Sequence, residues 1–519
     1  IKKLVGHRIL AINRGEAEKF LTVKIEAPRQ EILLWLVKQI IGNMKHDSAS
    51  YLYEAITDSY DRLIAPSIER EIRNELTEKA EEGAIGVFGK NLHQLLMQPP
   101  ISGQVVLGWD PGFAHGSKLA VVDETGKVLD TVIIYPTKGQ KNYDAAKQVL
   151  KKLIAKYHVT LISLGNGTAS RESEAMIVEL MKELNVDLKY VITDEAGASI
   201  YSASKEATEE FPDFDEWQRS AASIARRIQD PLAELVKIDP KSIGVGQYQH
   251  DMNQKNLGNA LNNVVEDCVN SVGIDLNTAS PALLSYVSGI NKTLAKSIVS
   301  YRETNGSFKN RKELLKVPKL GPKAYEQCAG FLRIHGGSEA LDATSVHPES
   351  YEATKALMEK IGVSEDDIKH GGMKGISKKT KDTKKLAEEL GIGEPTLVDI
   401  VKELEKPGRD PREEMPKPIL RSDVLEMKDL KPGMELKGTV RNVIDFGAFV
   451  DIGVHQDGLV HISRMSDKYI KHPLEVVSVG DIVDVTVMSV DLDKHRIQLS
   501  MIKSVSYTHL RAHETKANL

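Results

Sequence analysis

The sequence predicts a multidomain α+β protein, because helical and strand patterns occupy separate stretches of a 519-residue chain that is too long for one core. Residues 1–100 carry helical patterns, and strand patterns begin at 104. From 432 onward, five short strand patterns follow one another within about 70 residues, a density typical of a small closed barrel. We therefore expect a helical part, an α/β part and a barrel, joined by further helices.

Composition narrows the class of protein. The chain carries 28% charged residues and a net charge of -5, so any polyanionic partner must be met by local basic patches. The two cysteines, Cys268 and Cys328, match neither a metal motif nor a disulfide framework. No apolar run approaches the roughly 18 residues of a membrane-spanning helix. We expect a cytoplasmic protein without a membrane partner, and we expect a monomer. No Walker or dinucleotide-binding motif occurs, so no cofactor is expected.

Composition shifts and pattern changes suggest the domain boundaries. The expected parts are a helical segment (1–100), an α/β domain (104–235), a helical region (236–335) with paired hairpins at about 280–335, a small helical domain (340–405), a Pro-rich extended linker (406–430), a barrel (431–503) and a tail without periodicity (504–519). The chain opens at Ile1 rather than Met, which we interpret as a fragment that lacks its natural N-terminus. We interpret 504–519 as non-native sequence and exclude it from fold reasoning, with a short native tail as the alternative.

The α/β domain has a definite element order. Three strand patterns, "QVVLGWD", "KLAVVDE" and "VLDTVIIYP", precede alternating helices and strands. The expected helices lie at about 142–156, 172–184 and 215–230, which predicts a mixed α/β sheet. In the helical segment before it, we expect Pro66 to open a helix.

The hairpin region contains a near-repeat of 30 residues. Leu284, Val287 and Ile290 coincide with Leu314, Val317 and Leu320 after that shift. Each unit reads as a helix, a tight turn and a second helix. From 280 to 335 ten basic residues stand against three acidic ones, a balance that can offset phosphate charge. An architectural hairpin with a solvated basic face is the alternative.

Strand alternation assigns faces in the barrel. In "AFVDI", the residues Ala448, Val450 and Ile452 should face inward, and Phe449 should face outward with Asp451. On the next strand, His461 should also face outward. Arg441 lies outward on its own strand. Strict alternation turns Phe446 inward, unless a bulge at Gly447 re-aims it.

An outward Phe, His and Arg form a platform on which unpaired bases can stack. The barrel carries seven basic and ten acidic residues from 432 to 502, so its binding should depend on stacking rather than on a broad positive field. An edge-packed Phe449 without a binding role is the alternative.

Asp110 ends the first strand of the α/β domain, in "VVLGWDPG". A metal-dependent nuclease with an aspartate at such a strand end needs two metal ions, and therefore three or four converging carboxylates. The end of the fourth strand offers Gly165 and Asn166 instead. The last helix offers Asp215 and Glu216 only at its start, and its facing stretch carries Arg219 and Ser220. Asp194 and Glu195, after the fifth strand, can substitute only if the strand ends converge. We therefore predict no catalytic residue and no metal site, and interpret Asp110 as a turn-capping residue.

Three stretches resemble known families. The segment "GTVRNVIDFGAFVDIG…DGLVHIS…RIQLSMI" resembles an S1 domain, an RNA-binding OB-fold. That resemblance implies nucleic-acid contact by Phe446, Phe449, His461, Asp491 and Arg496, to which the outward position adds Arg441. "SGINK" and "KLGPK" resemble helix-hairpin-helix turns, whose amides bind phosphate oxygens.

The helix-hairpin-helix turns supply a second set of candidates. The residues are Gly289, Asn291, Lys292, Lys319, Gly321 and Lys323. The family's turn has two glycines around an apolar residue, and each copy here keeps one. We expect Asn291 to tolerate left-handed dihedrals. Lys319 departs from the pattern, so we expect the second turn to be the weaker amide clamp.

The α/β domain resembles the RNase H-like fold of the YqgF type, and the order of parts resembles the bacterial Tex family of transcription accessory proteins. That resemblance implies a fold of helical segment, RNase H-like α/β domain, helix-hairpin-helix pair, small helical domain and S1 OB-fold β-barrel. It implies a transcription-associated protein that binds single-stranded RNA, with DNA as a further ligand and RNA polymerase or ribosome-associated complexes as candidate partners. The alternatives are a metal-dependent nuclease centred on Asp110 and a protein-interaction scaffold of the transcription machinery.

Overall fold

The structure is a computed structural model that describes residues 1–502, except 2–3, 43–46, 137–141, 185, 381, 416–419, 421–426, 428–429, 445, 455 and 493. The chain forms two compact units, Ile1–His93 with Asp239–Cys268, and Gln94–Ile238 with Val269–Leu519. Residues 239–268, which follow the α/β domain in sequence, thus belong with the N-terminal helices. Each unit is described by itself.

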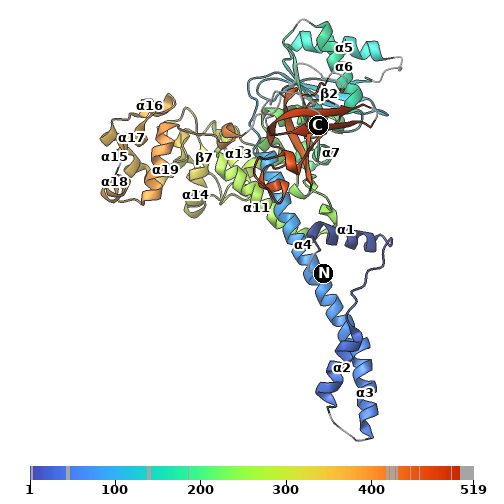
Figure 1. Ribbon diagram of the computed structural model, residues 1–519. Helices are drawn as coiled ribbons and strands as arrows, with labels where there is room; N and C mark the ends of the chain where they lie inside the picture. Colours follow the sequence, from blue (N-terminus) through green and yellow to red (C-terminus); the bar gives the residue numbers. More distant parts are fainter. Residues whose placement is uncertain are drawn as a thin grey trace, which may run out of the picture. The chain divides into compact units, whose positions relative to one another are not determined.

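The first unit is helical (Figure 1). Its elements are α1 (Gly6–Ala17), α2 (Arg29–Ile40), α3 (Ser48–Ser59), the π-helical turn η1 (Tyr60–Ile64), α4 (Ala65–Leu96), the 3₁₀ turns η2 (Pro240–Ser242) and η3 (Gln249–Asp251), and α11 (Gln254–Val272). The expectation that a helix begins at Pro66 is wrong, because α3, η1 and α4 follow one another without a break. A wider π turn stands just before Pro66, where the proline lacks the N–H that an α-helical hydrogen bond needs.

The RNase H-like domain is a sheet covered by helices on both faces. Its elements are β1 (Val106–Asp110), β2 (Ser117–Val122), β3 (Val128–Ile134), α5 (Tyr143–Tyr157), β4 (Leu161–Gly165), α6 (Ser170–Glu183), β5 (Lys189–Thr193), α7 (Ala198–Ser202), α8 (Lys205–Glu210), α9 (Glu216–Gln229) and α10 (Pro231–Leu235). The strand order is β3-β2-β1-β4-β5. Strands β1, β4 and β5 are parallel, and β2 runs antiparallel to both β1 and β3, which confirms the predicted mixed sheet.

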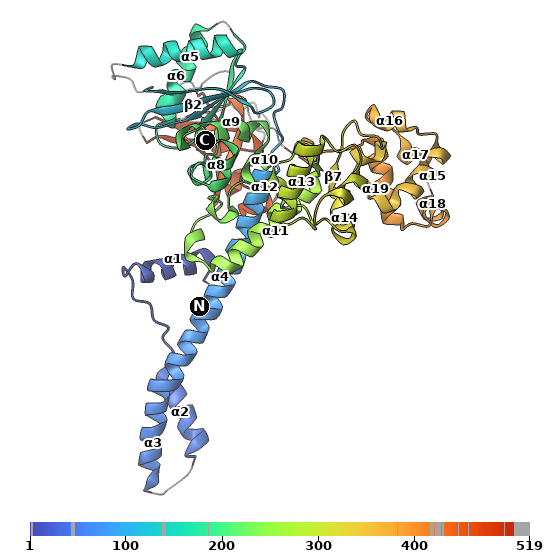
Figure 2. The same cartoon turned by 180° about the vertical axis from the view of Figure 1, so that it is seen from behind.

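The two faces of this sheet follow from strand alternation. Leu107 and Trp109 lie in the core that α5 and α6 cover, whereas Gly108 between them faces α9. A Cβ on Gly108 would overlap the backbone of Ala221 and Ala225, so glycine lets α9 lie directly on β1. Figure 2 shows α5 and α6 on one side of the sheet and α9 on the other. The carboxyl ends of β1, β4 and β5 therefore meet at one edge, close to the start of α9.

The helix-hairpin-helix region and the small helical domain are built from short elements. They are β6 (Ile274–Asp275), α12 (Pro281–Leu284), α13 (Lys292–Asn305), η4 (Arg311–Lys316), α14 (Pro322–Cys328), η5 (Ala329–Phe331), β7 (Leu332–Arg333), η6 (Ala340–Ala343), η7 (Pro348–Ser350), α15 (Tyr351–Ile361), α16 (Glu365–Lys369), α17 (Ile376–Lys379), α18 (Thr383–Leu390), α19 (Glu394–Glu405) and η8 (Pro411–Glu414). Because 411–414 form a 3₁₀ turn and Arg412 is buried against Asp230, at 2.7 Å, this part of the expected linker is folded rather than extended.

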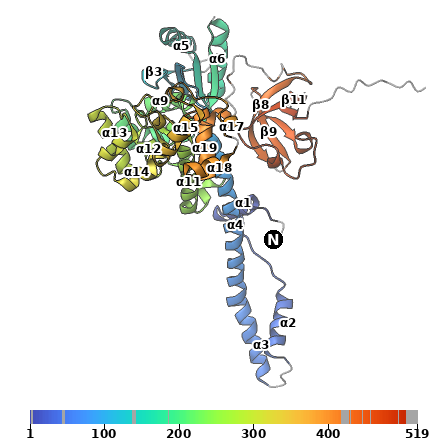
Figure 3. The same cartoon turned by 90° about the vertical axis from the view of Figure 1, so that its left-hand side faces the viewer.

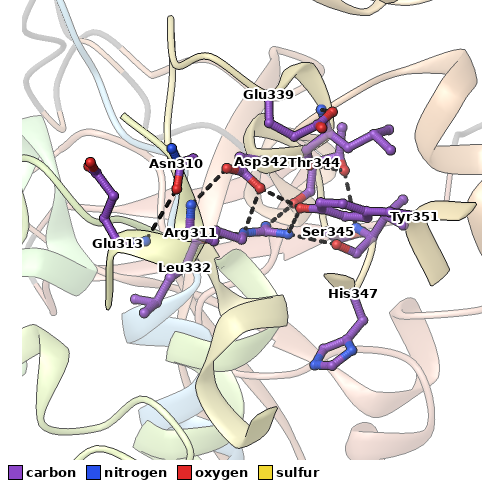
Figure 4. Close-up of polar contacts among 12 residues, drawn as sticks. Asn310, Arg311, Glu313, Leu332, Glu339, Asp342, Thr344, Ser345, His347 and Tyr351 are labelled. Carbon is purple, nitrogen blue, oxygen red and sulfur yellow. Dashed lines mark hydrogen bonds and ion pairs between the residues drawn. The ribbon is translucent and has the colours of Figure 1, made fainter. Parts of the chain in front are cut away.

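A buried arginine joins the second hairpin to the segment that leads into the small helical domain (Figure 4). The Arg311 guanidinium donates to the carbonyl oxygens of Leu332, at 2.6 Å, Val346, at 2.7 Å, and Thr344. Asp342 accepts from the Arg311 amide at 2.8 Å. With 1% of its surface exposed, Arg311 is a structural residue rather than part of a basic surface.

The C-terminal domain is a closed barrel. Its elements are β8 (Glu435–Ile444), β9 (Gly447–Asp451), β10 (Gly458–His461), η10 (Ile462–Arg464), η11 (Pro473–Glu475), β11 (Ile482–Asp491) and β12 (Arg496–Ser500). Its strand order is β10-β12-β11-β8-β9, and Figure 3 shows β8, β9 and β11. Ala448, Val450 and Ile452 are buried, as the alternation predicts. Asp451, which was expected to be outward, is also buried, because it pairs with Arg441 at 2.7 Å. This barrel confirms the expected OB-fold.

Two expectations concern other features of the chain. The tail at 504–519 lies outside the described residues. Among the helices of the described residues, none combines the length and the apolar character that crossing a membrane requires.

Candidate nucleic-acid interface

Strand pairing brings the predicted stacking residues of the barrel together. Gly447 on β9 lies opposite His461 on β10, and Phe449 lies opposite Leu459. Phe446 directly precedes β9, and its carbonyl accepts from the Ile462 amide at 2.8 Å. Because cross-strand partners and alternate residues lie on the same face of a sheet, Phe449 and His461 share one face of the β9–β10 pair. The Phe446 backbone adjoins the end of β10 through its bond with Ile462.

The three side chains differ in how freely they meet solvent. Phe446 is 52% exposed, whereas Phe449 is half-buried. The suggested bulge at Gly447 is wrong: Gly447 pairs in register with both neighbouring strands, and Phe446 is exposed because it belongs to the turn before β9. A Cβ on Gly447 would overlap the Val460 carbonyl, so glycine serves close strand approach there. The bulge lies on β8 instead, at Arg441.

His461 is held in one orientation. It caps η10 by accepting the Ser463 amide at its Nδ1, at 3.3 Å, and the same Nδ1 lies 2.9 Å from the Ser463 hydroxyl. Since an accepting Nδ1 carries no proton, the neutral ring carries its proton on Nε2. The ring is therefore fixed, and it is exposed.

The remaining barrel candidates lie further along the strands. Arg496 pairs with Asp491 across β12 and β11, about four residues or roughly 13 Å along from the level of His461. Arg441 donates to Asp451 at 2.7 Å and remains 42% exposed, so its charge is already partly used inside the barrel. Burial raises the pKa of the nearby Asp457 carboxyl, and the Asp451 charge adds to that effect while Arg441 opposes it.

The two hairpin turns have matching backbones. Gly289 has φ +81°, and Lys319, its equivalent 30 residues later, has φ +70°. The turn amides repeat as well: Ile290 donates to Val287 at 2.9 Å, and Leu320 donates to Val317 at 3.2 Å. Lys319 therefore takes the left-handed conformation that a glycine normally supplies, at some cost in strain.

The two turns differ in how the helix that follows each one is capped. The expectation that Asn291 takes left-handed dihedrals is wrong. Asn291 has φ -90°, which is extended rather than left-handed, and its side chain accepts from the amides of Thr293 and Leu294. Those amides of α13 are therefore occupied. At the equivalent position, Gly321 has no side chain, and no side-chain cap fills the first turn of α14. The structure thus leaves the second turn, with Lys319 and Lys323, as the one whose start is uncapped.

The basic surface of the hairpins is smaller than the residue count suggests. Of the ten basic residues from 280 to 335, Arg311 and Arg333 are buried, and Arg302 donates to the Leu276 carbonyl. Lys292, Lys319 and Lys323 are exposed. These three lysines flank the starts of α13 and α14, as the resemblance implies.

Asp110 lies in the pocket of the RNase H-like domain, where a lysine and a serine contact its carboxylate. Asp110 is 13% exposed, and its Oδ2 accepts from Lys118 Nζ at 3.3 Å and from Ser220 Oγ at 2.9 Å. Asp110 and Lys118 are cross-strand partners on β1 and β2. Ser220 comes from α9. A cavity of about 720 Å³ opens here, lined also by Glu195, Asp215 and Glu216.

Glu195 is the residue that sequence reasoning underestimated. Its carboxylate fills the space at the end of β4, where a Cβ on Gly165 or Gly167 would overlap it. Burial raises the pKa of the Glu195 carboxyl, the charges of Asp110 and Asp194 add to this, and the Gly167 amide and Arg227 partly oppose it. The signal in the sequence was the pair of glycines, read with the parallel order of β1, β4 and β5.

Arg227 holds the loop that carries Glu195. This buried residue of α9 donates to the carbonyl oxygens of Asp194, at 2.7 Å, and Ala196, at 2.8 Å. Burial lowers the pKa of the Arg227 guanidinium, while the surrounding carboxylates oppose that effect. Among the described residues, no three His, Cys, Asp or Glu side chains lie together in a way that could hold a metal ion.

Comparison with protein families assigns each part of the chain. Family models match at 1–88 (Tex central region-like), 104–229 (Tex protein YqgF-like domain), 269–333 (helix-hairpin-helix motif), 339–412 (HHH domain) and 429–502 (S1 RNA binding domain). These matches confirm the predicted kinds of domain.

Comparison with curated proteins extends the match to nearly the whole chain. Uncharacterized protein YdcI of Bacillus subtilis is 56% identical over 97% of this chain and 70% of its own length. Transcriptional accessory protein Tex of Neisseria gonorrhoeae is 48% identical, and Protein YhgF of Escherichia coli is 47% identical, each over 96% of this chain. The chain spans 66% and 65% of those two relatives. The chain therefore belongs to the Tex family.

Proposed function

We propose that the chain binds single-stranded RNA by stacking bases on the barrel residues Phe446, Phe449 and His461. The hairpins hold the nucleic-acid backbone, and the RNase H-like domain acts as a scaffold without nuclease activity. The observation that carries the proposal is that Phe449 and an oriented His461 share one face of the β9–β10 pair, with the exposed Phe446 in the turn that adjoins it.

The barrel surface favours single-stranded ligands because it binds by stacking rather than by attraction between charges. A base needs its face free to stack on an aromatic ring, and paired bases in a duplex do not offer it. The barrel has more acidic than basic residues, and Arg441 is already paired with Asp451. A general attraction to phosphate therefore contributes less at this surface than contact with unpaired bases.

The hairpins supply the charge that the barrel lacks. Lys292, Lys319 and Lys323 are exposed beside the two turns, and the uncapped start of α14 offers amides to a phosphate oxygen. Such contacts carry no sequence information, so they hold either RNA or DNA. RNA polymerase or ribosome-associated complexes are the partner classes that fit the scaffold part of this proposal.

The test replaces the stacking surface without opening the core. Phe446→Ala removes an exposed ring, and Phe449→Leu keeps apolar volume while it removes the aromatic face. Each base stacked on an aromatic ring contributes about 1–3 kcal/mol. Each substitution should therefore weaken RNA binding roughly 5- to 140-fold, as measured by fluorescence anisotropy of a labelled single strand.

Phe20→Ala is the matched control, because Phe20 is an aromatic residue that is 81% exposed in the N-terminal unit. It should leave the RNA affinity unchanged. If the variant with both barrel substitutions folds, as circular dichroism would show, and still binds RNA as tightly as the parent, the stacking site lies elsewhere.

A further inference from the structure

The RNase H-like fold implies a metal centre at the strand end that carries Asp110, and the side chains present can be tested against that requirement. Hydrolysis by two metal ions needs carboxylates that converge from several elements and leave oxygen atoms free for the metal. Asp110, from β1, is the first such group. Its surroundings decide whether a divalent cation fits.

Lys118 supplies the positive charge that faces the Asp110 carboxylate. The two residues are directly opposite each other in the β1–β2 register, so their side chains leave the sheet on the same face. Lys118 Nζ lies 3.3 Å from Asp110 Oδ2, and Ser220 donates to the same oxygen at 2.9 Å. One oxygen of the first carboxylate is therefore filled by two donors of the protein itself.

The last helix does not complete a ligand set. Ser220, a hydrogen-bond donor, takes the position on α9 from which an acid would reach Asp110. Asp215, at the start of α9, precedes Ser220 by more than one helical turn, and its backbone amide donates to the Gln218 side chain at 2.9 Å. Glu216 also lines the cavity, and the carboxylate whose charge acts on Asp110 is Glu195, whose Oε2 is buried without a hydrogen-bond partner. Among the described residues, no three of these carboxylates lie close enough together to hold a metal ion, so the pocket does not form a two-metal site.

We propose that Lys118 stands in place of a metal ion in this pocket, so that its ammonium group neutralises Asp110 and excludes Mg²⁺ and Mn²⁺. This inference rests on the proposed scaffold role of the RNase H-like domain. An ammonium group and a divalent cation compete for the same carboxylate, and the lysine is tethered at the correct register by the sheet. Removal of the lysine charge should therefore open a cation site between Asp110 and Glu195.

The experiment measures Mn²⁺ binding to the full chain by electron paramagnetic resonance, which reports the free ion. The parent should show no saturable binding that depends on Asp110. Lys118→Met keeps the length of the side chain and removes its charge, and it should bind one Mn²⁺ per chain. The added substitution Asp110→Asn should abolish that binding. Lys127→Met, which removes an exposed cation from the same domain, is the control and should behave as the parent does.

Two results would overturn the inference. One is saturable Mn²⁺ binding by the parent that Asp110→Asn removes. The other is a folded Lys118→Met variant that binds no more Mn²⁺ than the parent. If Lys118→Met does not fold, Lys118→Gln takes its place in the same titration.

RNA affinity, measured on the same samples, separates this inference from the proposed function. Lys118→Met should bind single-stranded RNA as the parent does. Failure of the parent to bind RNA would refute the proposed function and leave the Mn²⁺ result standing on its own.

Discussion

Replacement of Arg311 by methionine should strongly destabilise the hairpin region, because the Arg311 guanidinium is buried and fully engaged. The substitution removes the donors to the carbonyl oxygens of Leu332, Thr344 and Val346, together with the positive charge near Asp342. Asp342 is 2% exposed and keeps the Arg311 amide and the Tyr351 hydroxyl as donors. It is left without the compensating charge, at a depth that bulk water does not reach.

The loss of unfolding free energy in Arg311→Met can be estimated from the interactions that the substitution removes. Breaking a buried ion pair by removing one partner costs about 3–5 kcal/mol, which is a large share of the roughly 5–15 kcal/mol that stabilises a typical domain. For a region of about 150 residues, this corresponds to a decrease of roughly 6–20 °C in the melting temperature. Burial also raises the pKa of Tyr351, so its hydroxyl stays a donor to Asp342 at any ordinary pH.

Differential scanning calorimetry of the full chain measures the effect, because it separates transitions of different domains. Lys312→Met is the matched control, since Lys312 is the exposed neighbour on the same 3₁₀ turn and should change stability by less than about 0.5 kcal/mol. An Arg311→Met variant that melts within about 2 °C of the parent would show that the network contributes little, and the reasoning would fail.

Two further predictions concern the hairpins and the RNase H-like pocket. Lys319→Ala combined with Lys323→Ala should lower the salt dependence of single-strand binding. The slope of log affinity against log salt should fall by about 0.7 for each phosphate that the variant no longer binds. Lys316→Ala is the control and should leave the slope nearly unchanged, because the Lys316 ammonium is paired with Glu313 at 3.3 Å. An unaltered slope in the double variant would place the phosphate-binding residues elsewhere. The raised pKa of Glu195 means that the folded chain holds this proton more tightly than the unfolded chain, so its stabilising contribution is present at low pH and is lost as pH rises through the folded pKa. Glu195→Gln should therefore melt above the parent at neutral pH and approach it in acid, and a pH-independent difference between the two melting curves would contradict this account.

Much of the candidate interface follows from local pattern. Period-two alternation placed Ala448, Val450 and Ile452 inside the barrel, and the structure buries all three. The 30-residue repeat predicted two equivalent turns, and Gly289 and Lys319 share a left-handed backbone. In both cases the information is carried by neighbouring residues, because strand faces and turn conformations depend on spacing within one element.

Local pattern failed where the start of a strand, the capping of a helix or burial by other elements decided the outcome. Phe446 was expected to depend on a bulge at Gly447, yet it is exposed because the strand begins one residue later. Asn291 was expected to take a left-handed conformation, yet its side chain caps α13 and so favours an extended backbone. Ten basic residues were counted on the hairpins, yet Arg311 and Arg333 are buried.

The sequence by itself determined the kinds of domain, their order along the chain and the absence of an acid at Gly165 and Ser220, since these are read from residues and spacings. Only the tertiary structure decided that Glu195 fills the glycine-lined space at the end of β4, and that Lys118 lies opposite Asp110. The physical reason is that both contacts depend on which strands are neighbours and in which register. Strand order and register are set by packing of the whole sheet, and residues near Asp110 in sequence do not encode them.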